Sequence, residues 1–264
     1  MTCMKIKLTV IFLIIFIVTA SFGGMVSYRL LAKVRFETTT STPPSHNLWD
    51  ALMKDFVVDG HVNYKELLKN RERLDIYLIH LQAHVPSANW SREEQLAYWI
   101  NAYNAFTIKI VLDHFPLNSI KDISGKLQIP LVNTTWDINF IEIGDKKLSL
   151  NDIEHRILRK EFNEPAIHFA IVCASVSCPP LRSGAYFADK IDKQLNEQAL
   201  AFINDKSKNL IAVNHIEISK LFNWFEGDFT KTGSLVDFLN KYAATKINKD
   251  AKIDYLDYDW SLND

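Results

Sequence analysis

The first feature that this 264-residue sequence lacks is an excess of basic charge. It has 30 basic and 31 acidic side chains and a formal net charge of -1. Five basic residues precede Glu37, so the rest of the chain has 25 basic against 31 acidic side chains and a net charge of -6. Phosphate backbones repel a body of this charge, and no basic stripe with interleaved aromatic residues offsets the repulsion. We therefore expect no nucleic-acid partner.

Cysteine is also scarce, with three residues in the whole chain. His168, Cys173 and Cys178 are each separated by four residues, and this spacing lacks the tight ligand pairs of structural zinc sites. A fourth ligand is not evident either. We therefore expect no metal site and no cofactor. Cys3 precedes an apolar run without a lipoprotein-like pattern, and we assign it no role.

A third absence is the lack of any side chain that is charged at neutral pH between Lys7 and Arg29. The run from Leu8 to Ala20 is almost wholly apolar, and about 20 such residues suffice to cross a bilayer as a helix. Lysines followed by an apolar stretch also have the layout of a cleavable signal peptide. Residues 1–36 are therefore predicted to be a signal peptide or a signal anchor that brings the protein to a membrane.

The following residues, 37–46, are rich in Thr, Ser and Pro and are predicted to be a linker. The signal-like layout places the remaining domain outside the cytoplasm, either anchored to the membrane or secreted. In a bacterium this location would be the periplasm.

Residues 47–264 are predicted to form one domain of the α+β class. Hydrophobic residues make up 48% of the chain and charged residues 23%, which matches ordinary globular usage. The expected architecture is a central buried helix, several flanking helices and a small, mainly antiparallel sheet. The other expected helices are Leu48–Phe56, Tyr64–Leu81, 149–158, Ala185–Ile203 and Ser234–Tyr242, and the expected strands are Ile167–Ala174, Leu210–Ile218 and a hairpin around Gly144 and Asp145.

The central helix is predicted over residues 92–114. Ser91 and Glu94 form a capping-box signature at its start, and Pro116 closes it. Its apolar side chains cover most of its circumference, so Asn101 and Asn104 lie among buried positions and must be hydrogen-bonded. The simpler interpretation is that both bond to loop backbone. The alternative is that they orient or polarise a ligand.

A second segment, from His168 to Arg182, carries the candidate nucleophiles. If residues 167–174 form a strand, the side chains of His168 and Cys173 point to opposite faces, and Cys178 alone can fold back toward His168. Three interpretations of the cysteine pair stay open. The cysteines form a disulfide, as is natural in an exported protein, or one of them is a catalytic thiol, or both are buried and inert.

A third segment, from Phe222 to Phe229, is dense in aromatic residues around Gly227. Such density is typical of a packed corner. Asp228 within it could orient an imidazole, as a carboxylate does in catalytic triads.

Together with the terminal run Tyr258–Asn263, these blocks resemble a known family. Ala97–Ala105, His168–Arg182, Phe222–Phe229 and Tyr258–Asn263 resemble, in this order, the family catalogued as domain of unknown function 547. The resemblance implies no settled activity or cofactor, although similar members are often exported bacterial proteins. It implies the following site residues: Asn101, Tyr103, Asn104, His168, Cys173, Ser175, Cys178 and Asp228.

Two functions follow from these residues. In the first, the domain is a thiol-dependent hydrolase or acyltransferase with Cys178 or Cys173 as the nucleophile, His168 as the base and Asp228 as a further catalytic residue. Asn101, Tyr103, Asn104, Ser175 and Arg182 would then bind an unknown small-molecule or peptide ligand. In the second, it is a non-catalytic binding or scaffold domain with a Cys173–Cys178 disulfide.

The apolar N-terminus yields the first testable prediction. Deleting residues 1–36 should leave a soluble, folded domain, because the segment that engages lipid is then gone. The full-length protein should stay in membranes washed with carbonate, as detected by immunoblotting. Intact full-length protein found only in the cytosol would contradict the prediction.

Overall fold

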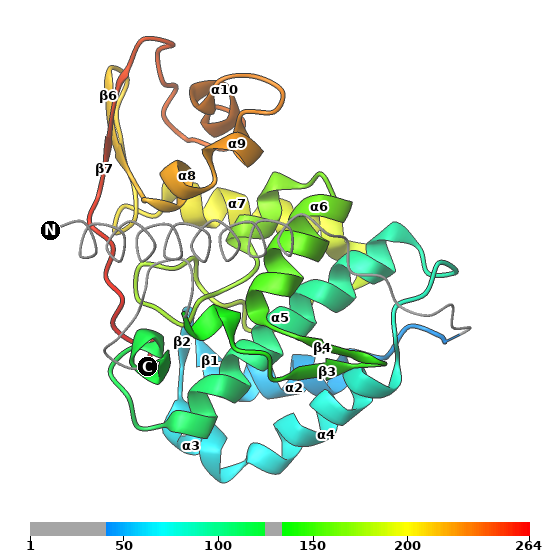
Figure 1. Ribbon diagram of the computed structural model, residues 1–264. Helices are drawn as coiled ribbons and strands as arrows, with labels where there is room; N and C mark the ends of the chain where they lie inside the picture. The colour runs from blue at the N-terminus through cyan, green and yellow to red at the C-terminus, as the bar shows by residue number, and fades with distance from the viewer. Residues whose placement is uncertain (1–40, 125–133) are drawn as a thin grey trace, which may run out of the picture.

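The computed structural model describes residues 41–124 and 134–264, and α5 (Arg92–His114) lies at their centre (Figure 1). The Ser91 hydroxyl accepts from the Glu94 amide, and the Glu94 carboxylate accepts from the Ser91 amide. The helix ends where extended Phe115 precedes Pro116. Every residue of α5 from Leu96 to Thr107 is buried, which confirms the central buried helix.

From residue 41 up to α5, the described chain forms a hairpin and three helices. They are α2 (Asn47–Phe56), β1 (Val57–Val58), β2 (His61–Val62), α3 (Tyr64–Lys69) and α4 (Arg71–Ala83). Asp59 and Gly60, with φ angles of 50° and 84°, make the turn between β1 and β2. A Cβ on Gly60 would lie 2.5 Å from Cβ of Pro180, so glycine lets this hairpin pack closely against the segment that follows Cys178.

After α5 come η1 (Ile120–Ser124), η2 (Thr135–Asp137) and the hairpin of β3 (Ile141–Ile143) and β4 (Lys146–Leu148). This hairpin was expected from the sequence and is confirmed. The Ser149 hydroxyl accepts from the Asp152 amide, and the Asp152 carboxylate accepts from the Ser149 amide. These bonds begin η3 (Asp152–Leu158), a π-helix that packs against α5 and continues into α6 (Arg159–Glu161).

The prediction of a strand over Ile167–Ala174 is wrong. Its first residues form the short 3₁₀-helix η4 (Pro165–Phe169), and irregular backbone follows. The segment is buried as expected, but side-chain amides satisfy its backbone in place of a neighbouring strand. Asn104 donates to the Ala170 carbonyl at 2.9 Å and accepts from the Val172 amide at 3.0 Å. Gln198 donates to the Phe169 carbonyl at 3.4 Å.

Three boundaries in the C-terminal half also differ from expectation. Residues 185–187 are not helical because Asn101 and Gln194 bond to their backbone, so α7 begins at Ile191. The expected strand Leu210–Ile218 is two antiparallel strands joined by a turn, and the last expected helix ends at Leu239. The elements are η5 (Ala188–Lys190), α7 (Ile191–Asn204), β5 (Leu210–Ile211), β6 (His215–Ile218), α8 (Leu221–Trp224), α9 (Glu226–Phe229), α10 (Leu235–Leu239) and β7 (Lys252–Tyr255).

The fold class is α+β, with helices around α5 and small sheets at the periphery (Figure 1). Strand β6 pairs antiparallel with β5 and parallel with β7. After β7 the chain runs back to the β1–β2 hairpin, where Asn263 accepts from the Val62 amide at 2.8 Å. This C-terminal segment, residues 256–263, lies beside the cysteine loop.

The predicted signal segment, residues 1–36, lies outside the described residues, as does part of the predicted linker. Within residues 41–124 and 134–264, no helix has the length and apolarity needed to cross a membrane.

Asn104 yields a prediction about stability. Replacing Asn104 with Leu keeps the bulk but leaves the Ala170 carbonyl and the Val172 amide without their partner, at a cost of about 1–3 kcal/mol. Urea denaturation should show this loss as a lower midpoint. Thr107→Val is the matched control, because the buried Thr107 hydroxyl has no hydrogen-bond partner among the described residues. A midpoint as high in Asn104→Leu as in Thr107→Val would contradict the prediction.

Candidate functional site

The candidate site is built around the loop from Cys173 to Cys178. Ala174 has a φ of 57°, in the left-handed region, and the Cys178 amide donates to the Ser175 carbonyl at 3.1 Å. These two features turn the chain back so that both cysteines face the same place. The C-terminal segment holds the loop from outside: its Ser261 carbonyl accepts from the Val176 amide at 2.8 Å.

Both cysteines are free thiols, so the disulfide considered from the sequence is not formed in this structure. Their Sγ atoms are 3.0 Å apart, within hydrogen-bond distance. The Cys173 sulfur is also 3.0 Å from the Ser175 hydroxyl and 3.3 Å from the Tyr258 hydroxyl. The Cys173 amide donates to the Cys178 sulfur at 3.0 Å.

The two thiols differ in acidity. Burial raises the pKa of Cys173, but its three side-chain hydrogen-bond partners outweigh burial and hold the pKa below the ordinary value. Burial, followed by the hydrogen bond and charge of Cys173, raises the pKa of Cys178 well above its ordinary value. Burial and the charges of both cysteines raise the pKa of Tyr258, so its phenol keeps its proton and can donate to the sulfur. Cys173 is therefore the thiol that ionises first.

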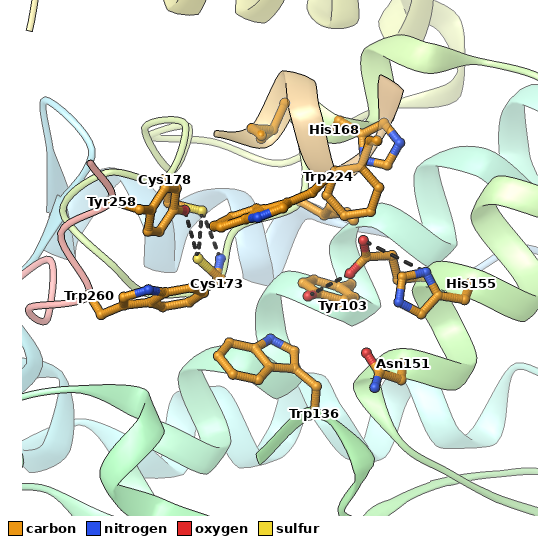
Figure 2. Close-up of a pocket in the computed structure, with 14 residues that line it drawn as sticks. Tyr103, Trp136, Asn151, His155, His168, Cys173, Cys178, Trp224, Tyr258 and Trp260 are labelled. Atoms are coloured by element: carbon orange, nitrogen blue, oxygen red, sulfur yellow. Dashed lines mark hydrogen bonds and ion pairs between the residues drawn. The ribbon is translucent and has the colours of Figure 1, made fainter. Parts of the chain in front are cut away.

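The thiols line a cavity of about 180 Å³ that is walled mainly by aromatic rings (Figure 2). Trp224, 44% exposed, stacks on Trp260 with centroids 5.8 Å apart and lies 4.7 Å from the Tyr258 ring. The expected packed corner therefore has two faces. Phe222 and Phe229 pack into the core, whereas Trp224 and Phe225 face the cavity.

The part of the wall away from the thiols is polar and comes from η3. Glu154 is buried, and its carboxylate accepts from the Tyr103 hydroxyl at 3.2 Å. Nδ1 of His155 lies 3.0 Å from Nη1 of Arg159, which can only donate. Nδ1 of His155 therefore accepts this bond, and Nε2, which faces the cavity in Figure 2, is the ring nitrogen that can donate. This wall thus offers one hydrogen-bond donor beside one carboxylate.

Among the described residues His168 has no hydrogen bond to a thiol, and its expected role as the base stays a prediction. Its Nε2 lies 2.8 Å from the Asp228 carboxylate, and its ring stacks on Phe225 at 4.0 Å. Burial lowers the pKa of His168, so the ring is neutral and donates to Asp228. The pairing of an imidazole with Asp228, expected from the sequence, is thus present.

Asp228 also binds Arg159, whose Nε donates to the same oxygen at 2.5 Å. Burial raises the pKa of Asp228, but the bonds from His168 and Arg159 outweigh it and hold the pKa well below the ordinary value. Arg159 therefore connects the buried His168–Asp228 pair to His155 on the cavity wall. Among the described residues, no hydrogen bond joins His168 to either cysteine.

The other sequence-predicted residues divide between the cavity and the scaffold. Tyr103 lines the cavity and Ser175 contacts the Cys173 sulfur. Asn101 and Asn104 bond to loop backbone, as the simpler interpretation expected: Asn101 donates to the Tyr186 carbonyl at 2.8 Å. Arg182 binds Glu197 at 3.0 Å and lines a different surface groove.

Sequence reasoning missed His155, Glu154, Arg159 and the aromatic wall. The two residues on η3 had no signal beyond their position in a short helix after the hairpin. Tyr258 and Trp260 did have one, because they belong to the fourth block of the family resemblance. Among residues 41–124 and 134–264, no group of three or more His, Cys, Asp or Glu side chains is arranged to hold a metal ion.

Comparison with known proteins supports the resemblance. Residues 87–203 match the model of the family described as protein of unknown function, DUF547. This stretch includes α5, η3 and both cysteines, whereas Tyr258 and Trp260 lie beyond it. No curated protein and no solved structure matches the chain. Residues 87–203, which carry the thiol loop and the central helix that holds it, are therefore similar to the DUF547 family.

Proposed function

We propose that the protein is a thiol-dependent hydrolase or acyltransferase in which Cys173 is the nucleophile. The observation that carries this proposal is the partly exposed residue Cys173, which lines an aromatic cavity. Its sulfur lies within hydrogen-bond distance of the Ser175 and Tyr258 hydroxyls, and both groups can donate to a thiolate. The thiolate is the reactive form of cysteine. A thiol whose thiolate is stabilised in this way needs no neighbouring histidine to remove its proton, so the pairing of His168 with Asp228 does not weaken the proposal.

Residues around the cavity can take part in each step of the acyl-transfer reaction. The Cys173 thiolate attacks a carbonyl carbon, and the N–H of His155 donates to the oxygen on which negative charge develops. Collapse of this intermediate expels the leaving group and forms a thioester. Water or an acceptor alcohol then attacks the thioester, and the Glu154 carboxylate is the group that takes its proton.

The size and lining of the cavity favour a small or partly inserted substrate. A volume of about 180 Å³ is below the roughly 300–1,000 Å³ typical of pockets that enclose a whole drug-sized ligand. The acyl part of a small ester, or one side chain of a peptide, would fit. The exposed face of Trp224 offers a flat apolar surface on which the rest of the substrate can lie.

We further propose that the domain works outside the cytoplasm, held at or released from a membrane by residues 1–36. The support is the long uncharged run at the N-terminus. The rival function, a binding or scaffold domain, is supported by the backbone bonds of Asn101 and Asn104, which fasten loops. A binding or scaffold function does not explain why the pKa of Cys173 is lowered beside a cavity.

The acidity of Cys173 is testable by alkylation. In the full chain carrying Cys3→Ser, the rate of iodoacetamide labelling at Cys173 should rise with pH and level off around an inflection below the free-cysteine pKa of about 8.5, because only the thiolate reacts. Tyr258→Phe removes one hydroxyl from the sulfur and should raise the inflection by about one unit.

Two controls sharpen this measurement. Ser177→Ala removes a hydroxyl from the same loop, one that accepts from the Asp259 amide, and should not move the inflection. His168→Gln should leave it in place too, because His168 bonds to Asp228. A wild-type inflection at or above about 8.5 would contradict the stabilised thiolate.

The reaction itself is testable with p-nitrophenyl acetate, an activated ester. We expect release of nitrophenol together with one acetyl group on Cys173, detected by peptide mass spectrometry. Cys173→Ser should abolish both, and His155→Gln should slow acetylation by about 10²–10³-fold, as loss of an oxyanion donor does. Arg182→Gln, outside the cavity, is the matched control and should keep the wild-type rate. Equal rates in wild type and Cys173→Ser would refute the proposal.

A further inference from the structure

The cysteine loop holds a second sulfur for which acyl transfer has no use. Cys178 is 6% exposed, and its sulfur lies 3.0 Å from that of Cys173 at one end of the cavity (Figure 2). A disulfide bond is about 2.05 Å long, so a movement of about 1 Å would join the two sulfurs. A buried thiol kept only for packing would not need to point at the one reactive sulfur of the site.

The surroundings of the two thiols also suit each of them to a different step of disulfide exchange. Cys173 is partly exposed and accepts hydrogen bonds from side chains, so it is suited to attack an incoming disulfide. Cys178 is buried and accepts a hydrogen bond from the Cys173 amide. That amide stays in place whatever is attached to the Cys173 sulfur, so it can stabilise Cys178 when Cys178 loses its proton.

The charge on Cys173 sets the order of events. While Cys173 is a thiolate, its negative charge helps to raise the pKa of Cys178 and keeps that thiol protonated. Once the Cys173 sulfur is bonded to another sulfur, this charge is gone. The pKa of Cys178 then falls from its raised value, and Cys178 becomes able to attack in turn.

We propose that Cys173 and Cys178 form a dithiol centre that reduces disulfides, with Cys173 as the attacking sulfur and Cys178 as the resolving sulfur. The Cys173 thiolate bonds to one sulfur of the substrate disulfide and expels the other as a thiolate. Cys178 loses its proton, bonds to the Cys173 sulfur and expels the first substrate sulfur. The substrate gains two electrons and leaves as two thiols, and the protein keeps a Cys173–Cys178 disulfide.

The loop is built to keep its place in both states. Asn104 fixes the Val172 amide next to Cys173, and the C-terminal segment fixes Val176 and Ser177 from outside. The Ser177 amide donates to the Asp259 carbonyl at 3.1 Å. Only the two side chains need to rotate when the bond forms. This activity does not rest on the proposed acyl transfer, which uses Cys173 alone.

The test uses the full chain with Cys3→Ser, purified as the dithiol in detergent, and oxidised glutathione as the substrate. After quenching with an alkylating agent, mass spectrometry should show wild type that has lost both titratable thiols and carries no glutathione. Cys178→Ser should stop at the mixed disulfide, with one glutathione on Cys173. Cys173→Ser should react at least about tenfold more slowly, because the remaining thiol is buried, and burial by itself limits access and raises its pKa. Ser177→Ala is the matched control and should behave as wild type.

A second substrate distinguishes small disulfides from those in polypeptides. Insulin, whose chains are joined by disulfides, should be reduced under the same conditions if the aromatic wall admits a polypeptide loop, and oxidised glutathione alone should react if it does not. Either result supports a dithiol centre. Glutathione that stays attached to wild-type Cys173, attachment to Cys178, or no reaction of the folded protein with either substrate would overturn it. If the protein shows no disulfide exchange although p-nitrophenyl acetate acetylates Cys173, this inference is overturned and the acyl-transfer proposal stands.

Discussion

The two hydrogen bonds between Asn104 and the backbone at Ala170 and Val172 are the constraint on which the site depends. They tie the buried segment before Cys173 to the middle of α5, the most buried helix of the described chain. An amide side chain does here what a neighbouring strand would do in a sheet, since it satisfies one donor and one acceptor of buried backbone. The segment can therefore leave the extended conformation and turn at Ala174, which brings Cys178 back to Cys173.

Much of the fold was readable in the sequence, and the failures at 167–174 and 185–187 have one cause. The central helix was predictable because its capping box and its proline are local signals, and the β3–β4 hairpin because its turn residues are. The apolar run at 167–174 indicates only that this segment is buried, and not which backbone conformation it adopts. Burial by strand pairing and burial by side-chain amides give the same hydrophobic pattern, so no local signal could separate them. The predicted helix at 185–187 is wrong for the same reason, because the side-chain amides of Asn101 and Gln194 bond to the backbone there.

The site was predictable to the extent that its residues share one segment. Cys173, Ser175 and Cys178 lie within six residues of one another, and the structure brings their side chains together. His155 and Tyr258 reach the same cavity from other parts of the chain, and nothing in spacing or composition indicates that they meet. His168 pairs through its Nε2 with Asp228, 60 residues away, and its expected role as the base stays a prediction. The sequence could suggest that His168 pairs with Asp228. It could not indicate that this pair contacts Arg159 and not a cysteine sulfur.

The C-terminal segment has a consequence for how the site comes into being during folding. Tyr64 and Asn263 bond across 199 residues, and Ser175 and Tyr258 across 83. Contacts of such long range form late, because the chain must close large loops before it gains them. The two cysteines, five residues apart, meet easily in an unfolded chain, where each has ordinary reactivity. The enhanced acidity of the Cys173 thiol belongs to the completed topology alone, so thiol reactivity near neutral pH would mark the last stage of folding and identify molecules in which the distant ends have met.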